Sequence, residues 1–297
     1  MRLLLRRGVA HHAGAEIITG SLEDEASLRR LVAGATAVVH IAGAIAARSR
    51  EEFFAVNARG AERLAQAAAA AGVRTFIHVS SLAAREPQLS DYGASKRAGE
   101  EVLAGHGFDL TILRPPVVYG PGDRTSLPLM AELTHRVAFL PGLPKSRFSL
   151  LYVEDFAAAA ARAIDHHREG THEIDDGTEG GYSWPDLVAI AAQVRGRNIA
   201  PIYLPRTLLL AACAPIGAAA RLLGATPFLS ADKVRQLYHS DWVCRPSNLT
   251  VPSPIRFAEG FARTVQWYRE QGWLRGPPIV DRTHPKAMRE NSFHDRA

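Results

Sequence analysis

Tyr92 and Lys96 have the types and the spacing of a proton-transfer pair. They stand four residues apart in a segment of helical pattern, so their side chains should lie on one face of a helix, one turn apart. A tyrosine hydroxyl, with an ordinary pKa of about 10, is a poor base at neutral pH. A neighbouring ammonium group stabilises the phenolate and typically lowers its pKa by about 1–3. The pair could therefore pass a proton to or from a substrate oxygen.

This spacing can also arise by chance, so the functional assignment of the pair requires further evidence from neighbouring residues. With seven tyrosines and few lysines in the chain, roughly one random sequence in ten would contain it. Ser80 and Ser81 give that support, because they end the strand-like run Phe76–Val79 and precede Tyr92 closely. Ligands of parallel α/β sheets sit at the carboxyl ends of the strands, where a serine hydroxyl can bind the reacting oxygen. The alternative is a serine that only caps the end of the strand.

The elements that must position these residues alternate along the first 160 residues. Several strand-like runs are almost continuously hydrophobic, as expected for parallel strands that are buried on both faces, with helices as crossovers. This pattern predicts an α/β fold with a doubly wound parallel sheet. The expected strands are 2–6, 16–20, 37–41, 75–80, 110–113 and 150–153. The expected helices are 25–32, 52–71, 92–103 and 127–137, and the segment 114–122 is expected to be a loop.

After about residue 170 the alternation gives way to helices joined by proline-rich connectors. The expected helices are 184–194, 207–223 and 258–271. We therefore predict a main domain over residues 1–165, a smaller and mostly helical lobe on the substrate side over 166–275, and a flexible tail over 276–297.

Composition excludes several functional classes. The net charge is +5, but the basic residues are scattered among acids, which disfavours nucleic-acid binding. The apolar run Leu208–Ala220 is shorter than the roughly 20 residues of a membrane span and is interpreted as core or as the wall of a pocket. The alternative is that this run contacts a membrane or an apolar substrate.

The two cysteines, Cys213 and Cys244, are expected to be reduced thiols. With no signal-peptide pattern at its start, the chain is expected to be cytoplasmic. No metal site is predicted.

In its order of motifs, the sequence resembles the extended short-chain dehydrogenase/reductase superfamily, of the NAD-dependent epimerase/dehydratase type. The resemblance covers roughly residues 1–275. The motifs that carry it are His40-Ile41-Ala42-Gly43, Val56-Asn57-x-x-Gly60, Val79-Ser80-Ser81, Tyr92-x-x-x-Lys96, Arg114-Pro115-x-x-Val118-Tyr119-Gly120-Pro121-Gly122 and Tyr152-Val153-x-Asp155.

This resemblance implies a Rossmann-like, dinucleotide-binding main domain and a role for each matching residue. Tyr92 would be the general acid or base, Lys96 would lower its pKa and hold the nicotinamide ribose, and Ser81 would bind the substrate oxygen. The implied cofactor-binding residues are Arg6, Ser21, Leu22, Ile41, Ala42, Gly43, Asn57, Val79, Lys96, Pro115 and Val118. The implied cofactor is NADP or NAD, with NADP favoured because a guanidinium at Arg6 suits a 2′-phosphate.

The sequence departs from the family at its N-terminus. Members of the family begin with a strand, a Gly-x-x-Gly-x-x-Gly turn and a helix whose N-terminus holds the pyrophosphate, and this sequence has no counterpart of that unit. Residues 2–6 match the family's second strand. About 30 residues of a central strand-helix unit would be missing. Three explanations are consistent with this departure: a misplaced start, a degenerate relative that binds cofactor poorly, or a first strand that slides into the vacant central position.

Two functional hypotheses follow. The first is an NAD(P)-dependent oxidoreductase or epimerase that interconverts an alcohol and a ketone of a small-molecule substrate, with Tyr92 exchanging the proton. The short spacing from Ser81 to Tyr92 disfavours nucleotide sugars and leaves carbonyl reduction, a sterol-like alcohol or the complex I-associated branch. The second is a non-catalytic or truncated member that acts as a binding or assembly protein. A homodimer is expected only by analogy with the family.

Overall fold

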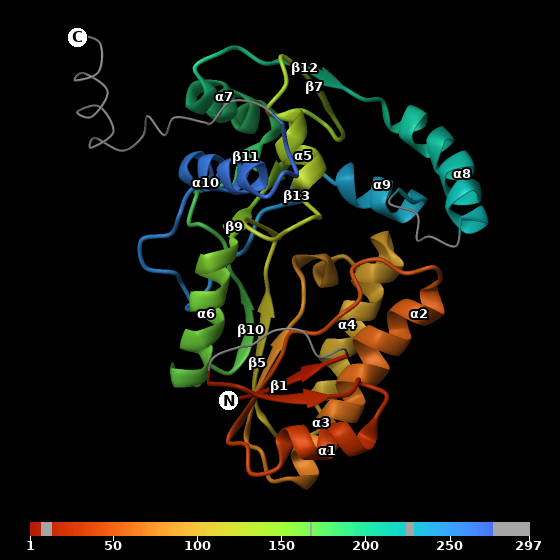
Figure 1. Cartoon of the computed structure of the whole chain (residues 1–297), viewed down its shortest axis with the longest axis vertical. Helices are drawn as coiled ribbons and strands as arrows, with labels where there is room; N and C mark the ends of the chain where they lie inside the picture. The colour runs from red at the N-terminus through yellow and green to blue at the C-terminus, as the bar shows by residue number, and fades with distance from the viewer. Residues whose placement is uncertain (7–13, 167, 224–228, 276–297) are drawn as a thin grey trace.

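The computed structural model describes residues 1–6, 14–166, 168–223 and 229–275. The predicted tail, residues 276–297, lies outside the described residues. The chain forms a mixed α/β fold in which parallel strands are covered by helices on both sides (Figure 1). The predicted fold class is therefore confirmed.

A four-stranded parallel sheet forms the centre of the main domain. Its order is β10-β5-β4-β3, with β3 at Ala37–His40, β4 at Thr75–Val79, β5 at Asp109–Arg114 and β10 at Gly170–Glu173. All five residues of β4 are buried. This strand is buried along its whole length, as expected for a strand with both faces covered.

The first two strands form a separate parallel pair. β1 (Arg2–Leu5) pairs with β2 (Glu16–Thr19). Among the described strands, β3 pairs with β4 alone, so β1 and β3 each keep one edge without a partner. The alternative in which the first strand slides into the central position is therefore not what the structure shows.

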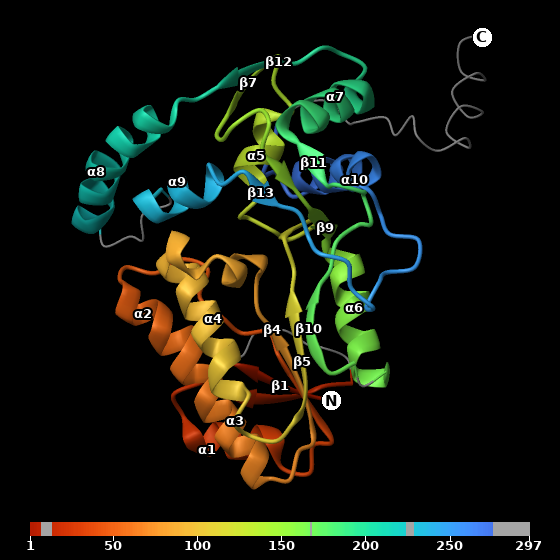
Figure 2. The ribbon, with the colours of Figure 1, turned by 180° about the vertical axis from the view of Figure 1, so that it is seen from behind.

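Helices cover the two faces of the central sheet unequally. Figures 1 and 2 show α1 (Glu25–Val32), α2 (Arg50–Phe54), α3 (Gly60–Ala70) and α4 (Asp91–Leu103) on one side and α6 (Val153–His166) on the other. The predicted helix 52–71 is found as α2, one π-helical segment over Ala55–Arg59, and α3 in direct succession.

The remaining elements form a lobe above the carboxyl ends of the strands. Its short sheets are β6 (Val117–Tyr119) with β9 (Leu150–Tyr152), β7 (Val137–Leu140) with β12 (Ala200–Tyr203), and β8 (Arg147–Phe148) with β11 (Tyr182–Ser183) and β13 (Asp241–Trp242). Its helices are α5 (Leu127–Glu132), α7 (Trp184–Arg195), α8 (Arg206–Leu222), α9 (Ala231–Leu237) and α10 (Phe257–Glu270). The core of the lobe is a cluster of buried aromatic side chains that includes Tyr119, Phe257, Phe261 and Tyr268.

Two expectations about this region are wrong in detail. The segment 114–122 contains a strand, β6, because Val117–Tyr119 pairs in parallel with β9. The predicted helix 127–137 ends at Glu132, because Val137 starts strand β7, which pairs with β12. The proposed division of the chain at residue 165 stays a prediction.

Candidate active site

The first two turns of α4 carry the predicted proton-transfer pair. The helix begins at Asp91 because Ser90 caps it, with the Ser90 Oγ accepting a hydrogen bond from the Gly93 amide at 2.9 Å. Tyr92 is the second residue of the helix and Lys96 follows one turn later. The helical spacing read from the sequence is thus the spacing in the structure.

Lys96 is held at the carboxyl end of β4. Its Nζ donates a hydrogen bond to the carbonyl oxygen of Val79 at 2.7 Å, and the residue is only 4% exposed. Burial lowers the pKa of Lys96 to about 8, and the Glu100 carboxylate acts in the opposite direction. The ammonium is therefore fixed in a dry environment beside the strand end, where its charge acts strongly on its neighbours.

The side chains of Ser81 and Tyr92 interact with each other near the carboxyl end of β4. Ser81 caps a short 3₁₀ helix over Leu82–Arg85, its Oγ accepting from the Ala83 amide at 3.2 Å. Burial raises the pKa of Tyr92, and hydrogen bonding with the Ser81 side chain opposes this rise. The Ser81 hydroxyl therefore caps the 3₁₀ helix that follows, and it also interacts with Tyr92.

The direction of the Tyr92 pKa differs from the sequence expectation. Lys96 was expected to lower the pKa of the tyrosine, whereas burial raises it. The reason is that the half-buried ring lies against protein, including the Phe53 ring at a centroid distance of 6.0 Å. A tyrosine with a raised pKa is protonated at neutral pH and is suited to donate its proton.

Asn57 braces the loop after β3 against α4. Its amide nitrogen donates to the Ala44 carbonyl at 3.0 Å and to the Ser95 Oγ at 2.9 Å, while its Oδ1 accepts from the Ala44 amide at 2.7 Å. A Cβ at Gly43 would lie 3.1 Å from the Asn57 Oδ1 and 3.5 Å from the Lys96 Nζ. Gly43 therefore passes close to the lysine head group, where a larger residue would crowd it.

The exit of β5 closes the site from the other side. The Ser80 amide donates to the Leu113 carbonyl and the Leu82 amide to the Pro115 carbonyl, each at 2.8 Å. Pro115 is buried and Val118, on β6, is half-buried. The two predicted strand exits thus lie side by side and hold Ser81 between them.

The remaining predicted cofactor residues lie at two other places. Ile41 and Ala42 are exposed in the loop directly after β3. Arg6 is exposed at the end of β1, and Ser21 and Leu22 follow β2. The last three residues therefore directly follow the two strands of the β1–β2 pair.

A buried ion pair behind Lys96 was not predicted. The Arg114 guanidinium binds the Glu100 carboxylate at 2.8 Å and 2.5 Å, and the Ser80 Oγ donates to the same carboxylate at 2.5 Å. The side chains of Arg114 and Glu100 are 11% and 5% exposed. The sequence indicated only the place of Glu100, which follows Lys96 by four residues and so shares its face of α4, and not its pairing with Arg114.

Two stacked histidines lie behind the same lysine. The rings of His40 and His78 are 5.2 Å apart, and both residues are buried. Burial and the charge of Lys96 lower the pKa of His40 to about 3 and that of His78 well below the ordinary value. Both imidazoles are therefore neutral, and they add no positive charge next to the lysine.

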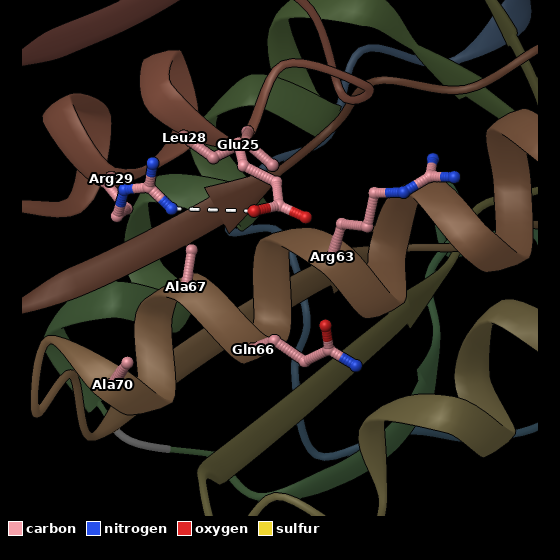
Figure 3. A pocket seen from close by; sticks show the side chains of 7 residues that line it. All are labelled: Glu25, Leu28, Arg29, Arg63, Gln66, Ala67 and Ala70. Atoms are coloured by element: carbon pink, nitrogen blue, oxygen red, sulfur yellow. Dashed lines mark hydrogen bonds and ion pairs between the residues drawn. The ribbon is translucent and has the colours of Figure 1, made fainter.

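The groove between α1 and α3 lies elsewhere, at the base of the view in Figure 1. Figure 3 shows its lining, with the Glu25–Arg29 ion pair on α1 facing Arg63 and Gln66 on α3. None of these residues belongs to the predicted site. Within the described parts of the chain, no group of acidic, histidine or cysteine side chains is arranged to hold a metal ion.

Comparison with known proteins adds three findings. The family model described as "NAD dependent epimerase/dehydratase family" matches residues 3–175. A protein named ceramide reductase, from Caulobacter vibrioides, is 41% identical over 280 residues, which are 92% of this chain and 88% of that protein. Among solved structures, MoeE5 in complex with UDP-glucuronic acid and NAD matches with a TM-score of 0.63 and 19% identity, over 91% of each chain.

Proposed function

The chain belongs to the NAD-dependent epimerase/dehydratase family, and from this premise we propose that it reduces a ketone group on a ceramide-type lipid, with NADPH as the hydride donor. Its place in the family makes it an NAD(P)-dependent enzyme of the oxidoreductase or epimerase type. The reaction direction, the lipid substrate and the preference for NADPH belong to the proposal.

The observation that carries the proposal is the grouping of Ser81, Tyr92 and Lys96 at the carboxyl end of β4. A protonated Tyr92 suits reduction, because a carbonyl oxygen that accepts a hydride at its carbon must also gain a proton. The 41% identical relative is itself named a reductase.

The cofactor-side residues fit a nicotinamide nucleotide at one end of the site. Gly43 brings the backbone close to the Lys96 Nζ, where a side chain would crowd the lysine, and the exposed loop Ile41–Gly43 offers backbone and apolar surface at the strand end. Lys96 would hold the ribose hydroxyls, and Pro115 and Val118 would lie against the nicotinamide. The sequence offers no glycine-rich turn for the pyrophosphate, so Arg6 and Ser21 would supply the contacts at the far end.

The protein's part in the reaction is to bind, orient and protonate. When bound, NADPH supplies the hydride, and that chemistry belongs to the cofactor. The Ser81 hydroxyl donates a hydrogen bond to the ketone oxygen and holds it beside the Tyr92 hydroxyl. Tyr92 transfers its proton to that oxygen, so the ketone becomes a secondary alcohol. The charge of Lys96, fixed by its bond to Val79, stabilises the phenolate that remains.

Three lines support a lipid substrate. The close relative is named for ceramide. The short spacing from Ser81 to Tyr92 disfavours nucleotide sugars. The lobe above the strand ends is rich in apolar side chains, with an aromatic core and several exposed hydrophobic residues on its rim.

The test is direct. The purified chain is incubated with NADPH and a synthetic ketone analogue of ceramide, and the lipid product is identified by mass spectrometry. We expect formation of the hydroxyl lipid with stoichiometric oxidation of NADPH, and a slower reaction with NADH. A folded chain that oxidises NADPH with nucleotide-sugar ketones but not with the lipid would refute the lipid assignment.

A further inference from the structure

Helix α8 is apolar on all sides and is not part of any core. From Thr207 to Ala220 it contains no charged residue, and none of its described residues is buried. Leu208 is 55% exposed and Leu222 is 88% exposed. By contrast, α10 buries seven of its residues in the core of the same lobe. An apolar helix in contact with water has little to stabilise it, so α8 needs a partner.

The length and the exposure of α8 limit the kinds of partner that could cover it. Helices that are hydrophobic on all sides are found in protein cores or in membranes. The structure excludes the core, since α8 runs along the outside of the molecule in both views (Figures 1 and 2). In the described part of the chain no helix qualifies as a membrane span. An apolar run of 14 residues is too short to span a bilayer and is typical of a buried core helix or of a segment that lies in the interface of a bilayer.

The charge around α8 favours an anionic surface. From Ile199 to Ala231, a segment that includes α8, the sequence contains two arginines and no acidic residue. Arg206 stands exposed at the first turn of α8, and Arg221 follows the apolar run in the sequence. Arginines that flank an apolar helix bind the anionic head groups of lipids, while the apolar side chains enter the acyl boundary.

Helix α9 connects α8 to the candidate active site. α8 contacts α9, and α9 is hydrogen-bonded to the start of α4. The Asp91 amide donates to the Asp232 Oδ2 at 2.9 Å, and the Gln236 Nε2 donates to the Ser90 Oγ at 2.6 Å. Asp91 directly precedes Tyr92. An occupant of the α8 surface would thus lie one helix away from the catalytic tyrosine.

We propose that α8 docks in the surface of an anionic lipid bilayer, so that a membrane lipid can reach Tyr92 without crossing water. The proposal rests on the proposed function for its lipid substrate, and on the exposure, length and charge of α8 for the docking itself. A second copy of the chain is the competing occupant, and the experiment includes it as an outcome.

The experiment measures flotation of the full chain with vesicles. Vesicles of phosphatidylethanolamine and phosphatidylglycerol are compared with vesicles of phosphatidylcholine alone. Leu208→Glu places a charge on the exposed face of α8. Its matched control is Ile164→Glu on α6, where the residue is 37% exposed. Both substitutions are at exposed positions, so both variants should fold, which thermal unfolding verifies.

We expect the unaltered chain and Ile164→Glu to float with the anionic vesicles and to bind phosphatidylcholine less. Leu208→Glu should lower vesicle binding by about tenfold or more. Its reduction of a short-chain, water-soluble ketone should stay unchanged, while its reduction of a long-chain ketone lipid in vesicles should fall. Equal flotation of all three proteins, or no flotation of the unaltered chain, would overturn the proposal.

Further results distinguish docking on a bilayer from dimerisation, and failure of the docking proposal from failure of the proposed function. A dimer that forms without vesicles and is dissociated by Leu208→Glu assigns α8 to a second copy and also overturns the proposal. Vesicle binding without reduction of any ketone would refute the proposed function and leave the docking surface standing. Reduction of the soluble ketone without vesicle binding would refute the docking and leave the function standing.

Discussion

Replacement of Glu100 by glutamine tests the buried support behind the site. In the folded chain the Glu100 carboxylate accepts two hydrogen bonds from Arg114 and one from Ser80, at 2.5–2.8 Å. The substitution removes the negative charge and one of the two acceptor oxygens, so the Arg114 guanidinium keeps its charge, 11% exposed, without a full partner. Removal of one partner from a buried ion pair costs about 3–5 kcal/mol of unfolding free energy.

Because glutamine is a conservative replacement for glutamate, we expect a loss of unfolding free energy at the lower end of this range, about 3 kcal/mol. For a chain of this size such a loss corresponds to a fall in Tm of roughly 6–12 °C. The assay is urea unfolding followed by circular dichroism, together with a thermal scan. The matched control is Glu101→Gln, because Glu101 is 63% exposed in its side chain and pairs with Arg97 at the surface. That substitution should change the free energy of unfolding by about 0.5 kcal/mol or less.

A double-mutant cycle completes this test. If Glu100 and Arg114 act as a pair, the variant with both residues replaced by glutamine should lose less stability than the sum of the two single variants. A Glu100→Gln variant that is no less stable than Glu101→Gln would refute the reasoning, because the buried carboxylate would then contribute no more than an exposed one.

Three further predictions concern packing and protons. Gly99→Ala should lower the unfolding free energy by about 1–3 kcal/mol in urea titrations, because its Cβ would overlap the Asn57 carbonyl oxygen, whereas Gly105→Ala, with nothing near its Cβ, should have little effect. Because burial lowers the pKa of His40 from 6.5 to about 3, the unfolded chain binds more protons than the folded chain between these values. The free energy of unfolding should therefore fall as the pH decreases through this window, and fall less in His40→Leu; equal pH dependence would contradict the buried, neutral state of His40. The rate of ketone reduction should fall as the pH rises through about 8, where Lys96 loses its charge, and Lys96→Arg should show no such fall in its pH–rate profile.

The sequence predicted the elements of the candidate site well, because their signals are local. Periodicity placed α4 within one residue of its observed start, and the position of Ser81 after an apolar run placed it at the end of β4. The match to the family model and to a solved structure confirms the Rossmann-like fold that the motifs predicted. The roles of Ser81, Tyr92 and Lys96 stay predictions, as do the division into domains and the assignment of the cofactor residues.

The features that the sequence did not predict depend on distant contacts. The Glu100–Arg114 pair joins α4 to β5, and no local pattern indicates such a partner. β6 and β7 form because Val117–Tyr119 and Val137–Leu140 find partners 33 and 63 residues away along the chain, at Leu150 and Ala200. The raised pKa of Tyr92 follows from burial, which residue spacing does not report.

The central claim is that Tyr92 donates the proton in an NADPH-dependent reduction. The most direct measurement is the single-turnover rate of Tyr92→Phe with the ketone lipid, with NADPH affinity determined by fluorescence titration of the same sample. We expect the rate to fall by about 100-fold or more while the affinity for NADPH stays nearly unchanged. An unchanged rate in a folded Tyr92→Phe variant would contradict the account.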